Sequence, residues 1–211
     1  MTVRNAASMG THGSMWQAHG YSGGGSVGSL IDCLQGRPAI IVGGAHGVFN
    51  ELRFALRVVK NPVVFAVNDV GMFLPHVDHW ISLHSDALGP WKNVRWAHSL
   101  VQDHTKYHSV DPRPYIDYVW ERLTPCFAIS GYFAMQIAWI MGASPIVLAG
   151  CPGERKRRFF EMDARPDFSY GGEADAEGVR KQLESEMERL PDFRQAVRSM
   201  SGWTRSYFGG I

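Results

Sequence analysis

Residues 129–153, ISGYFAMQIAWIMGASPIVLAGCPG, constrain the fold more than any other part of the chain. The run from Pro145 to Ala149 is short, apolar and rich in branched side chains, which is typical of a parallel strand covered on both faces. The helix before it carries four apolar side chains at helical spacing: Phe133, Ile137, Ile140 and Met141. One apolar stripe of this kind predicts a helix that packs on a sheet.

Strands and helices also alternate through the first part of the chain. We expect strands at 38–42, 63–67 and 80–83, a helix over about 48–59 and a shorter helix near 70–76. Alternation of this kind predicts an α/β fold with an open, mostly parallel sheet, right-handed crossovers and helices on both faces. The length of 211 residues suits a single domain.

Three regions depart from this regular alternation. Residues 1–36 are expected to form a Gly- and Ser-rich N-terminal arm, so that the α/β domain covers 37–211. Residues 90–125, rich in polar and aromatic side chains, are expected to form an insertion over the sheet edge, with a short helix near 114–122. Residues 173–211 are expected to form a C-terminal helical tail that begins with a charged helix.

Composition argues against several classes of protein. A formal net charge of +1 gives no general drive toward nucleic acid or anionic lipid. The apolar stretches fall short of the ~20 residues that a membrane helix needs, and the first residues lack the pattern of a secretory signal. The three cysteines show no C-x-x-C spacing, which favours reduced thiols. We therefore expect a cytoplasmic protein without a membrane span. The sequence is compatible with a monomer and with a homo-oligomer.

Candidate binding residues follow the predicted strands. Gly43 and Gly44 come directly after the first strand, and Asn68 comes directly after the second. In an open α/β sheet, ligands bind beyond the carboxyl ends of the strands, where the strand order reverses. The sequence GGAHG is neither a GxGxxG dinucleotide fingerprint nor a P-loop. A tight turn is the alternative explanation for each glycine taken alone, so it is their convergence that predicts a site.

A second half of the site is predicted where the helix of the 129–153 segment begins. Ser130 and Gly131 stand there, and the unpaired N–H groups of a helix N-terminus attract anions such as phosphate. An ordinary Ser N-cap followed by a permissive glycine is the alternative. The basic run after the strand supplies Arg155 and Arg157 as candidates for contact with a phosphate or an acidic substrate, or else forms a solvated charged surface.

All nine histidines lie within the first 108 residues, and one stretch gathers five side chains of metal-ligating type: His76, Asp78, His79, His84 and Asp86. The stretch has neither H-x-x-x-H on a helix nor a Cys/His pair, so we expect no bound metal. His84, at a strand end, is the preferred general acid or base because imidazole titrates near neutral pH. His46, in the glycine turn, is the second candidate, and it could instead donate to a phosphate.

A family resemblance rests on four segments taken together: PAIIVGGAHGVFNEL, VVFAVNDV, HVDHWISLHSD and ISGYFAMQIAWIMGASPIVLAGCPG. They resemble a superfamily that includes the 6-hydroxymethylpterin diphosphokinase-like proteins and bacterial motility accessory factors, and their arrangement is similar to that of the family 42 sialyltransferases. The resemblance implies a Rossmann-like fold that holds a nucleotide between the first glycine turn and the Ser-Gly helix start. The implied contacts are Gly43, Gly44, Asn68, Ser130 and Gly131.

The sialyltransferase-like members imply a CMP-sugar donor, no essential metal, and a histidine base from a later segment. In the relatives the first turn usually reads G-x-G-P-S-L, whereas here it reads GGAHGVF. Because no histidine follows His108, either a different residue serves as base or the chain does not perform that reaction. Tyr170 and Tyr207 are later candidates for phosphate contacts.

Three functions follow from these patterns. The leading one is a nucleotide-dependent transferase, glycosyltransferase-like, that uses a nucleotide sugar of CMP type. The second is an ATP-dependent diphosphokinase acting on a small hydroxymethyl acceptor, with Mg²⁺ held by carboxylates such as Asp69 or Asp86. The third is a noncatalytic nucleotide-binding or assembly module, since a fold alone does not establish an activity.

Overall fold

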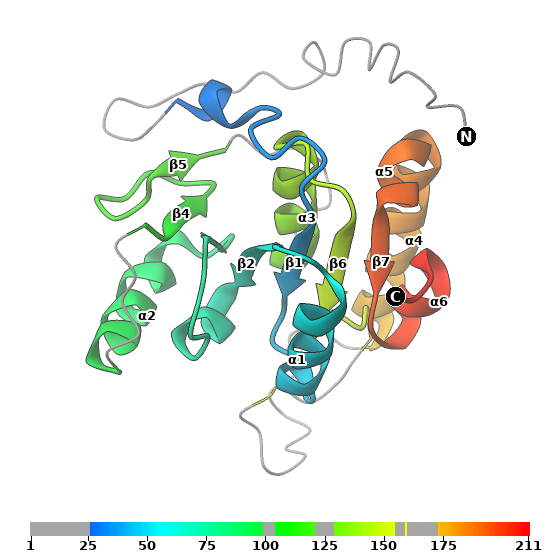
Figure 1. Cartoon of the computed structure of the whole chain (residues 1–211), viewed down its shortest axis with the longest axis horizontal. Coiled ribbons are helices and arrows are strands. Elements are labelled where there is room, and N and C mark those ends of the chain that lie inside the picture. Colours follow the sequence, from blue (N-terminus) through cyan, green and yellow to red (C-terminus); the bar gives the residue numbers. More distant parts are fainter. Residues whose placement is uncertain (1–25, 99–103, 121–128, 155–158, 160–172) are drawn as a thin grey trace.

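The computed structural model describes residues 26–98, 104–120, 129–154, 159 and 173–211. Within them the chain forms the strands β1 (Ala39–Val42), β2 (Val63–Val67), β3 (His79–Ile81), β4 (Lys106–Ser109), β5 (Tyr118–Val119), β6 (Ile146–Ala149) and β7 (Val197–Ser199). All pairings are parallel, and the strands form one sheet in the order β5-β4-β3-β2-β1-β6-β7 (Figure 1). The predicted open, parallel α/β sheet is therefore confirmed.

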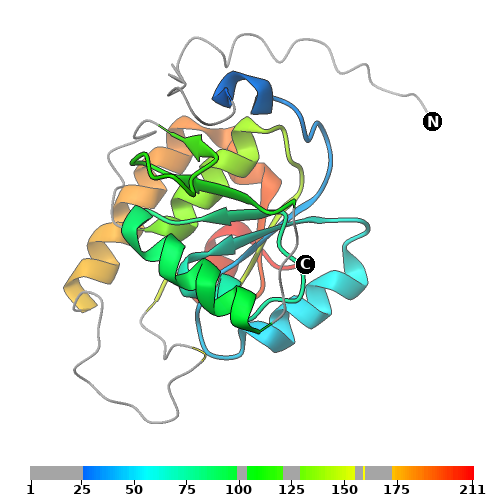
Figure 2. The ribbon, with the colours of Figure 1, turned by 90° about the vertical axis from the view of Figure 1, so that its left-hand side faces the viewer.

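The helices lie on both faces of this sheet (Figure 2). The α-helices are α1 (Val48–Val58), α2 (Ser85–Ala97), α3 (Ser130–Ile140), α4 (Glu173–Arg189), α5 (Pro191–Ala196) and α6 (Gly202–Phe208), and short 3-10 helices are η2 (Val27–Leu30) and η3 (Asn68–Met72). One hydrophobic layer joins the sheet to α1, η3 and α2, and the other joins it to α3 and the C-terminal helices. Every residue of β1, β2 and β6 is buried, as continuous apolar runs predict for strands covered on both faces.

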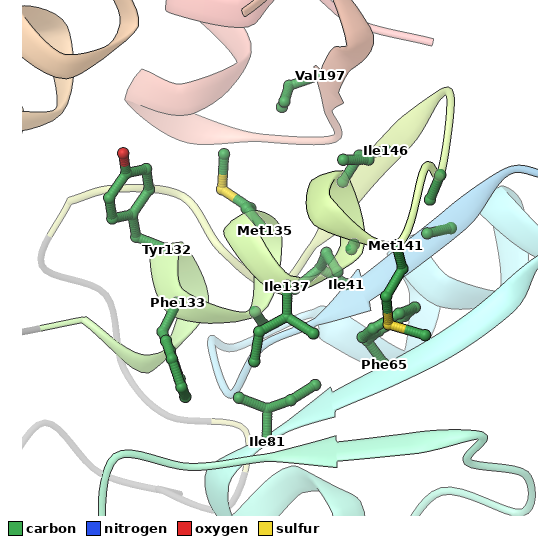
Figure 3. Close-up of a cluster of buried hydrophobic side chains, with 14 of the residues drawn as sticks. Ile41, Phe65, Ile81, Tyr132, Phe133, Met135, Ile137, Met141, Ile146 and Val197 are labelled. Carbon is green, nitrogen blue, oxygen red and sulfur yellow. The ribbon is translucent and has the colours of Figure 1, made fainter. Parts of the chain in front are cut away.

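Helix α3 fills the centre of the second layer. Ile137 points toward Ile81 of β3, and Met141 lies beside Phe65 of β2 (Figure 3). On the opposite side of the helix, Tyr132 and Met135 turn toward the part of the molecule that holds Val197 (Figure 3). The predicted stripe is thus only part of the buried surface. The other side of α3 is buried as well, because α4, α5 and β7 cover it.

The expectation for residues 90–125 needs correction. Instead of an insertion over the sheet edge, this region supplies the second half of α2 and the strands β4 and β5, which extend the sheet beyond β3. The helix predicted near 114–122 is wrong, because Tyr118 and Val119 pair with His108 and Ser109. Strand β3 also covers His79–Ile81 rather than 80–83, and the short helix η3 begins at Asn68.

The two ends of the described chain also differ from expectation. The C-terminal region is not wholly helical, because β7 stands between α5 and α6 and pairs with β6. The last part of the predicted arm belongs to the core, since Val27, Leu30 and Leu34 are buried there. The rest of that arm lies outside the described residues. No helix in the described part of the chain has both the length and the apolar character to span a membrane.

Candidate functional site

The strand order reverses between β1 and β6. From β1 the chain adds β2, β3, β4 and β5 on one side, and the next strand, β6, returns to the other side of β1. The carboxyl ends of these two strands are followed by Gly43 and Gly44 and by Gly150 and Cys151. Such a reversal point is where open α/β sheets bind ligands. The structure therefore places the predicted glycine turn at the preferred edge.

Gly43 holds the two strand ends together. Its N–H donates to the Ala149 carbonyl at 2.8 Å, and a Cβ at this position would collide with the Gly150 carbonyl and the Cys151 thiol. Gly44 is half-buried, and its carbonyl accepts the N–H of Phe159 at 3.0 Å. Because the N–H of Gly43 is committed to the sheet, Gly44 is the better placed of the two glycines for a ligand.

Glu51 completes this edge, although the sequence reasoning did not single it out. Its carboxylate accepts the N–H of Gly150 at 2.7 Å. Glu51 belongs to the first turn of α1, where a negative charge is favourable because the helix N-terminus carries partial positive charge. Its position shortly after the glycine turn is the sequence feature from which this role could have been predicted. The N-terminus of α1 thus already holds an anionic group from the chain itself.

The N-terminus of α3 differs from those of α1 and α2. None of the three has a side-chain cap, but α1 carries Glu51 in its first turn and α2 carries Asp86, whereas α3 has no acidic residue there. Its N-cap is Ile129, so the Ser N-cap alternative is not what the structure shows. The Ser130 hydroxyl instead accepts the N–H of Leu83 at 3.3 Å. Of these three helix starts, α3 is the one left without an acidic group of its own.

A line of hydrogen bonds joins the ends of β2, β3 and β4. The Ser82 hydroxyl donates to Asn68 Oδ1 at 2.8 Å and accepts the N–H of His84 at 2.9 Å. Ser109 Oγ donates to the Ser82 carbonyl at 2.7 Å. Asn68 adopts φ +57°, in the left-handed region that Asn tolerates better than most residues. With Oδ1 occupied by Ser82, its side-chain NH₂ group is the donor that a ligand could use.

The two predicted catalytic histidines are both exposed at this edge. His84 is the residue directly before α2, and the Ser82 hydroxyl links its backbone to the side chain of Asn68. His46 lies in the turn between β1 and α1. An exposed imidazole can exchange protons with solvent, as a general acid or base must between turnovers.

The dense patch of histidines and aspartates is divided by the fold. His76 Nε2 pairs with Asp78 Oδ1 at 3.0 Å before β3 begins, while His84 and Asp86 follow its end. His79 is buried and contacts His108 of β4. Within the described ranges, no three His, Cys, Asp or Glu side chains come together in a way that could hold a metal ion.

Cys151 follows β6 and lies between the two predicted halves of the site, the glycine turn and the start of α3. Its Sγ would touch a Cβ at Gly43, and a Cβ at Gly131 would be 3.8 Å from it. Burial, together with the nearby Glu51 carboxylate, raises the pKa of this thiol to about 12. The thiol therefore stays protonated at neutral pH, which makes it a packing group rather than a nucleophile.

The candidates in the basic run and beyond, Arg155, Arg157 and Tyr170, lie outside the described residues. Phe159, which follows the run, packs edge to face on Phe49 of α1 at 5.5 Å and on Phe73 at 5.4 Å between ring centroids. The chain after β6 thus returns to the same edge as the glycine turn.

No protein-family model and no curated protein matches this sequence. Among solved structures, the chain is similar to the sialyltransferase CstII from Campylobacter jejuni, determined in complex with a substrate analogue, CMP-3FNeuAc. The two are 11% identical with a TM-score of 0.52, over 81% of this chain and 84% of that chain. The fold that the sialyltransferase resemblance implies is thereby confirmed, whereas the resemblance to the diphosphokinase-like proteins stays a prediction.

Proposed function

We propose that this chain is a nucleotide-dependent transferase of the glycosyltransferase type, with a nucleotide sugar of CMP type as donor. The observation that carries the proposal is the N-terminus of α3, which begins without an acidic residue at the strand-end edge. Unpaired N–H groups and the helix dipole favour a phosphate at such a place. The similar fold of a sialyltransferase solved with a CMP-sugar analogue supports this donor class.

The residues around this helix start take separate roles in the proposal. The N–H groups at Ser130 and Gly131 receive the donor phosphate, and the Asn68 side-chain NH₂ and the backbone of Gly44 contact the rest of the nucleotide. Gly43 acts indirectly, because it lets β1 and β6 approach each other. Arg155, Arg157 and Tyr170 are proposed as further contacts to the phosphate or to an acidic acceptor.

The reaction is a substitution at the anomeric carbon of the donor sugar. An acceptor hydroxyl oxygen forms a new bond to that carbon while the bond from the carbon to the phosphate oxygen breaks. The hydroxyl proton passes to the imidazole of His84, with His46 as the second candidate, and the electron pair leaves on the nucleotide phosphate. Fixed dipoles at the α3 N-terminus stabilise the negative charge that develops there.

A noncatalytic module is the second candidate, and two contacts at the strand-end edge favour it. The Cys151 thiol already lies between the glycine turn and the start of α3, and Glu51 already holds the N–H of Gly150. Both contacts stabilise the edge without a ligand. The diphosphokinase alternative differs from both in requiring Mg²⁺ near Asp69 or Asp86.

Thermal denaturation with CMP, UDP, GDP or ATP, each with and without Mg²⁺, separates these functions. A ligand that binds only the folded chain raises its apparent stability, by about 2.7 kcal/mol at a hundred times its Kd. Stabilisation by CMP without metal supports the proposed transferase, and a response only to ATP with Mg²⁺ supports the diphosphokinase. The absence of a response to any nucleotide would overturn both enzyme functions.

A further inference from the structure

A cavity of about 630 Å³ lies beside the last strand of the sheet, away from the glycine turn. It is lined by residues from the C-terminal end of α4, from α5, from β7 and from the end of α6: Met187, Glu188, Pro191, Arg194, Gln195, Arg198, Tyr207, Phe208 and Gly209. These elements stand together at the β7 side of the molecule (Figure 1). A volume of this size matches sites that hold small molecules, which span about 300–1,000 Å³.

Arg198 is held in place at this cavity by the backbone. Its Nη1 donates to the carbonyls of Gln195 and Val197 at 2.8 and 2.7 Å. The Nε and Nη2 donors form the side of the guanidinium group that binds a carboxylate or a phosphate through two parallel hydrogen bonds. Among the described residues, neither of these donors has a partner. Two backbone anchors fix the group before a ligand arrives, so less side-chain entropy is lost on binding.

Arg194 is fixed in a different way. Its guanidinium lies over the ring of Tyr207, 4.5 Å from the centroid, and Tyr207 in turn stacks on Trp203 with centroids 5.0 Å apart and planes 8° apart. Stacking uses the flat face of the guanidinium group and leaves its in-plane N–H donors free. Arg194 and Tyr207, which both line the cavity, form an aromatic and cationic wall.

In the described part of the chain, neither Arg194 nor Arg198 forms an ion pair with a carboxylate. Within the described part of the chain, no Asp or Glu oxygen lies within the 4.0 Å ion-pair distance of either guanidinium, although Glu188 also lines the cavity. By contrast, the nearby Arg189 pairs with Glu186 at 3.8 Å. Burial raises the pKa of Tyr207, so its hydroxyl stays protonated at neutral pH and can donate. The cavity is therefore lined by two guanidinium groups and the Tyr207 hydroxyl as donors, with the carboxylates of Glu188 and Glu184 nearby.

We propose that this cavity binds a small organic anion, whose carboxylate or phosphate group pairs with Arg198 and Arg194 and whose apolar body lies against the edge of the Tyr207 ring. The site is independent of the proposed transferase function. Tyr207 is a candidate for a phosphate contact from the sequence, and the cavity places this residue away from the edge where the nucleotide is proposed to bind.

Isothermal titration of the full chain with phenyl phosphate, benzoate and inorganic phosphate tests the proposal. We expect phenyl phosphate or benzoate to bind, and the better of the two identifies the preferred anionic group. Arg198→Gln and Arg194→Gln should each weaken that binding at least about tenfold, the loss expected for one charged contact worth about 1.4 kcal/mol. Arg189→Gln, which removes a neighbouring arginine that does not line the cavity, should leave the binding unchanged.

Two outcomes would overturn the site: no binding of either organic anion, or equal binding by all three variants. Equal affinity for inorganic phosphate would overturn the role given to Tyr207. Far-UV circular dichroism confirms folding of each variant. If Arg198→Gln fails to fold because its backbone anchors are lost, Arg194→Gln still decides, since the Arg194 side chain is exposed.

Discussion

His79 Nδ1 and His108 Nε2 lie 2.8 Å apart inside the sheet, in a hydrogen bond between neighbouring strands. The Trp120 indole N–H donates to His108 Nδ1 at 2.9 Å. Because an indole nitrogen can only donate, the proton of neutral His108 stands on Nε2 and is donated to His79. The three side chains form one directed chain of hydrogen bonds in which both imidazoles are neutral.

The stability of the fold should therefore fall as the pH falls. Burial lowers the pKa of His79 from 6.5 to about 4 and lowers that of His108 well below 6.5. Between these pH values the unfolded chain binds protons that the folded chain does not, so stability is full above pH 6.5 and declines toward pH 4. His79 alone should lose on the order of 3 kcal/mol over that window. Urea unfolding at pH 7, 6 and 5 measures how the free energy of unfolding changes with pH. A value that stayed constant would contradict the burial of His79 and His108 as neutral imidazoles.

Trp120→Phe should destabilise the fold by about 1–3 kcal/mol, because His108 Nδ1 would be left buried without its donor. Trp120 is 1% exposed. Trp96→Phe is the matched control, since Trp96 is 71% exposed and surface changes usually stay within about 0.5 kcal/mol. Chemical denaturation measures the free energy of unfolding of both variants. An equal loss in the two would show that the indole N–H of Trp120 does not contribute to stability.

Gly43→Ala should destabilise the fold by about 1–3 kcal/mol, the usual cost of overpacking a tight interior. The added methyl group would meet the Gly150 carbonyl, a backbone group that cannot move without disturbing β6. Gly178→Ala in α4 is the opposite case, because a Cβ there meets nothing within 4 Å. It should stabilise the helix by about 0.5–1 kcal/mol. The pair of Tm shifts should thus have opposite signs.

The sequence predicted the strands whose environment is uniform and missed those whose environment is mixed. β1, β2 and β6 are wholly buried, so their apolar runs stand out. β4, with the sequence KYHS, reads as polar, because His108 and Ser109 are buried through hydrogen bonds that no local pattern reveals. Helix α2 was hidden by Pro90, which interrupts the helical pattern but is accommodated within the helix.

For the candidate site, too, the sequence predicted what local patterns determine and missed the long-range contacts. The residues after β1, β2 and β6 were located correctly, because the carboxyl ends of parallel strands share one edge. Their partners could not be foreseen. Glu51 and Gly150 are 99 residues apart in sequence, and the bond between them depends on β6 returning to the side of β1. Long-range contacts of this kind arise only from the assembled sheet.

Gly131→Asp should abolish nucleotide binding while the fold is retained. A side chain fits there, because a Cβ at position 131 has only ordinary contacts, 3.8 Å from Cys151 Sγ and from Ile129 Cγ2. A carboxylate in the first turn of α3 would compete with a phosphate for the helix start, and by itself it should stabilise the helix by about 0.3–1 kcal/mol. Gly131→Asn, of equal size but neutral, is the matched control and should keep most of the binding. Thermal denaturation with and without CMP measures both effects. If Gly131→Asp retained the full shift with CMP, the phosphate would have to lie elsewhere and the role proposed for α3 would be wrong.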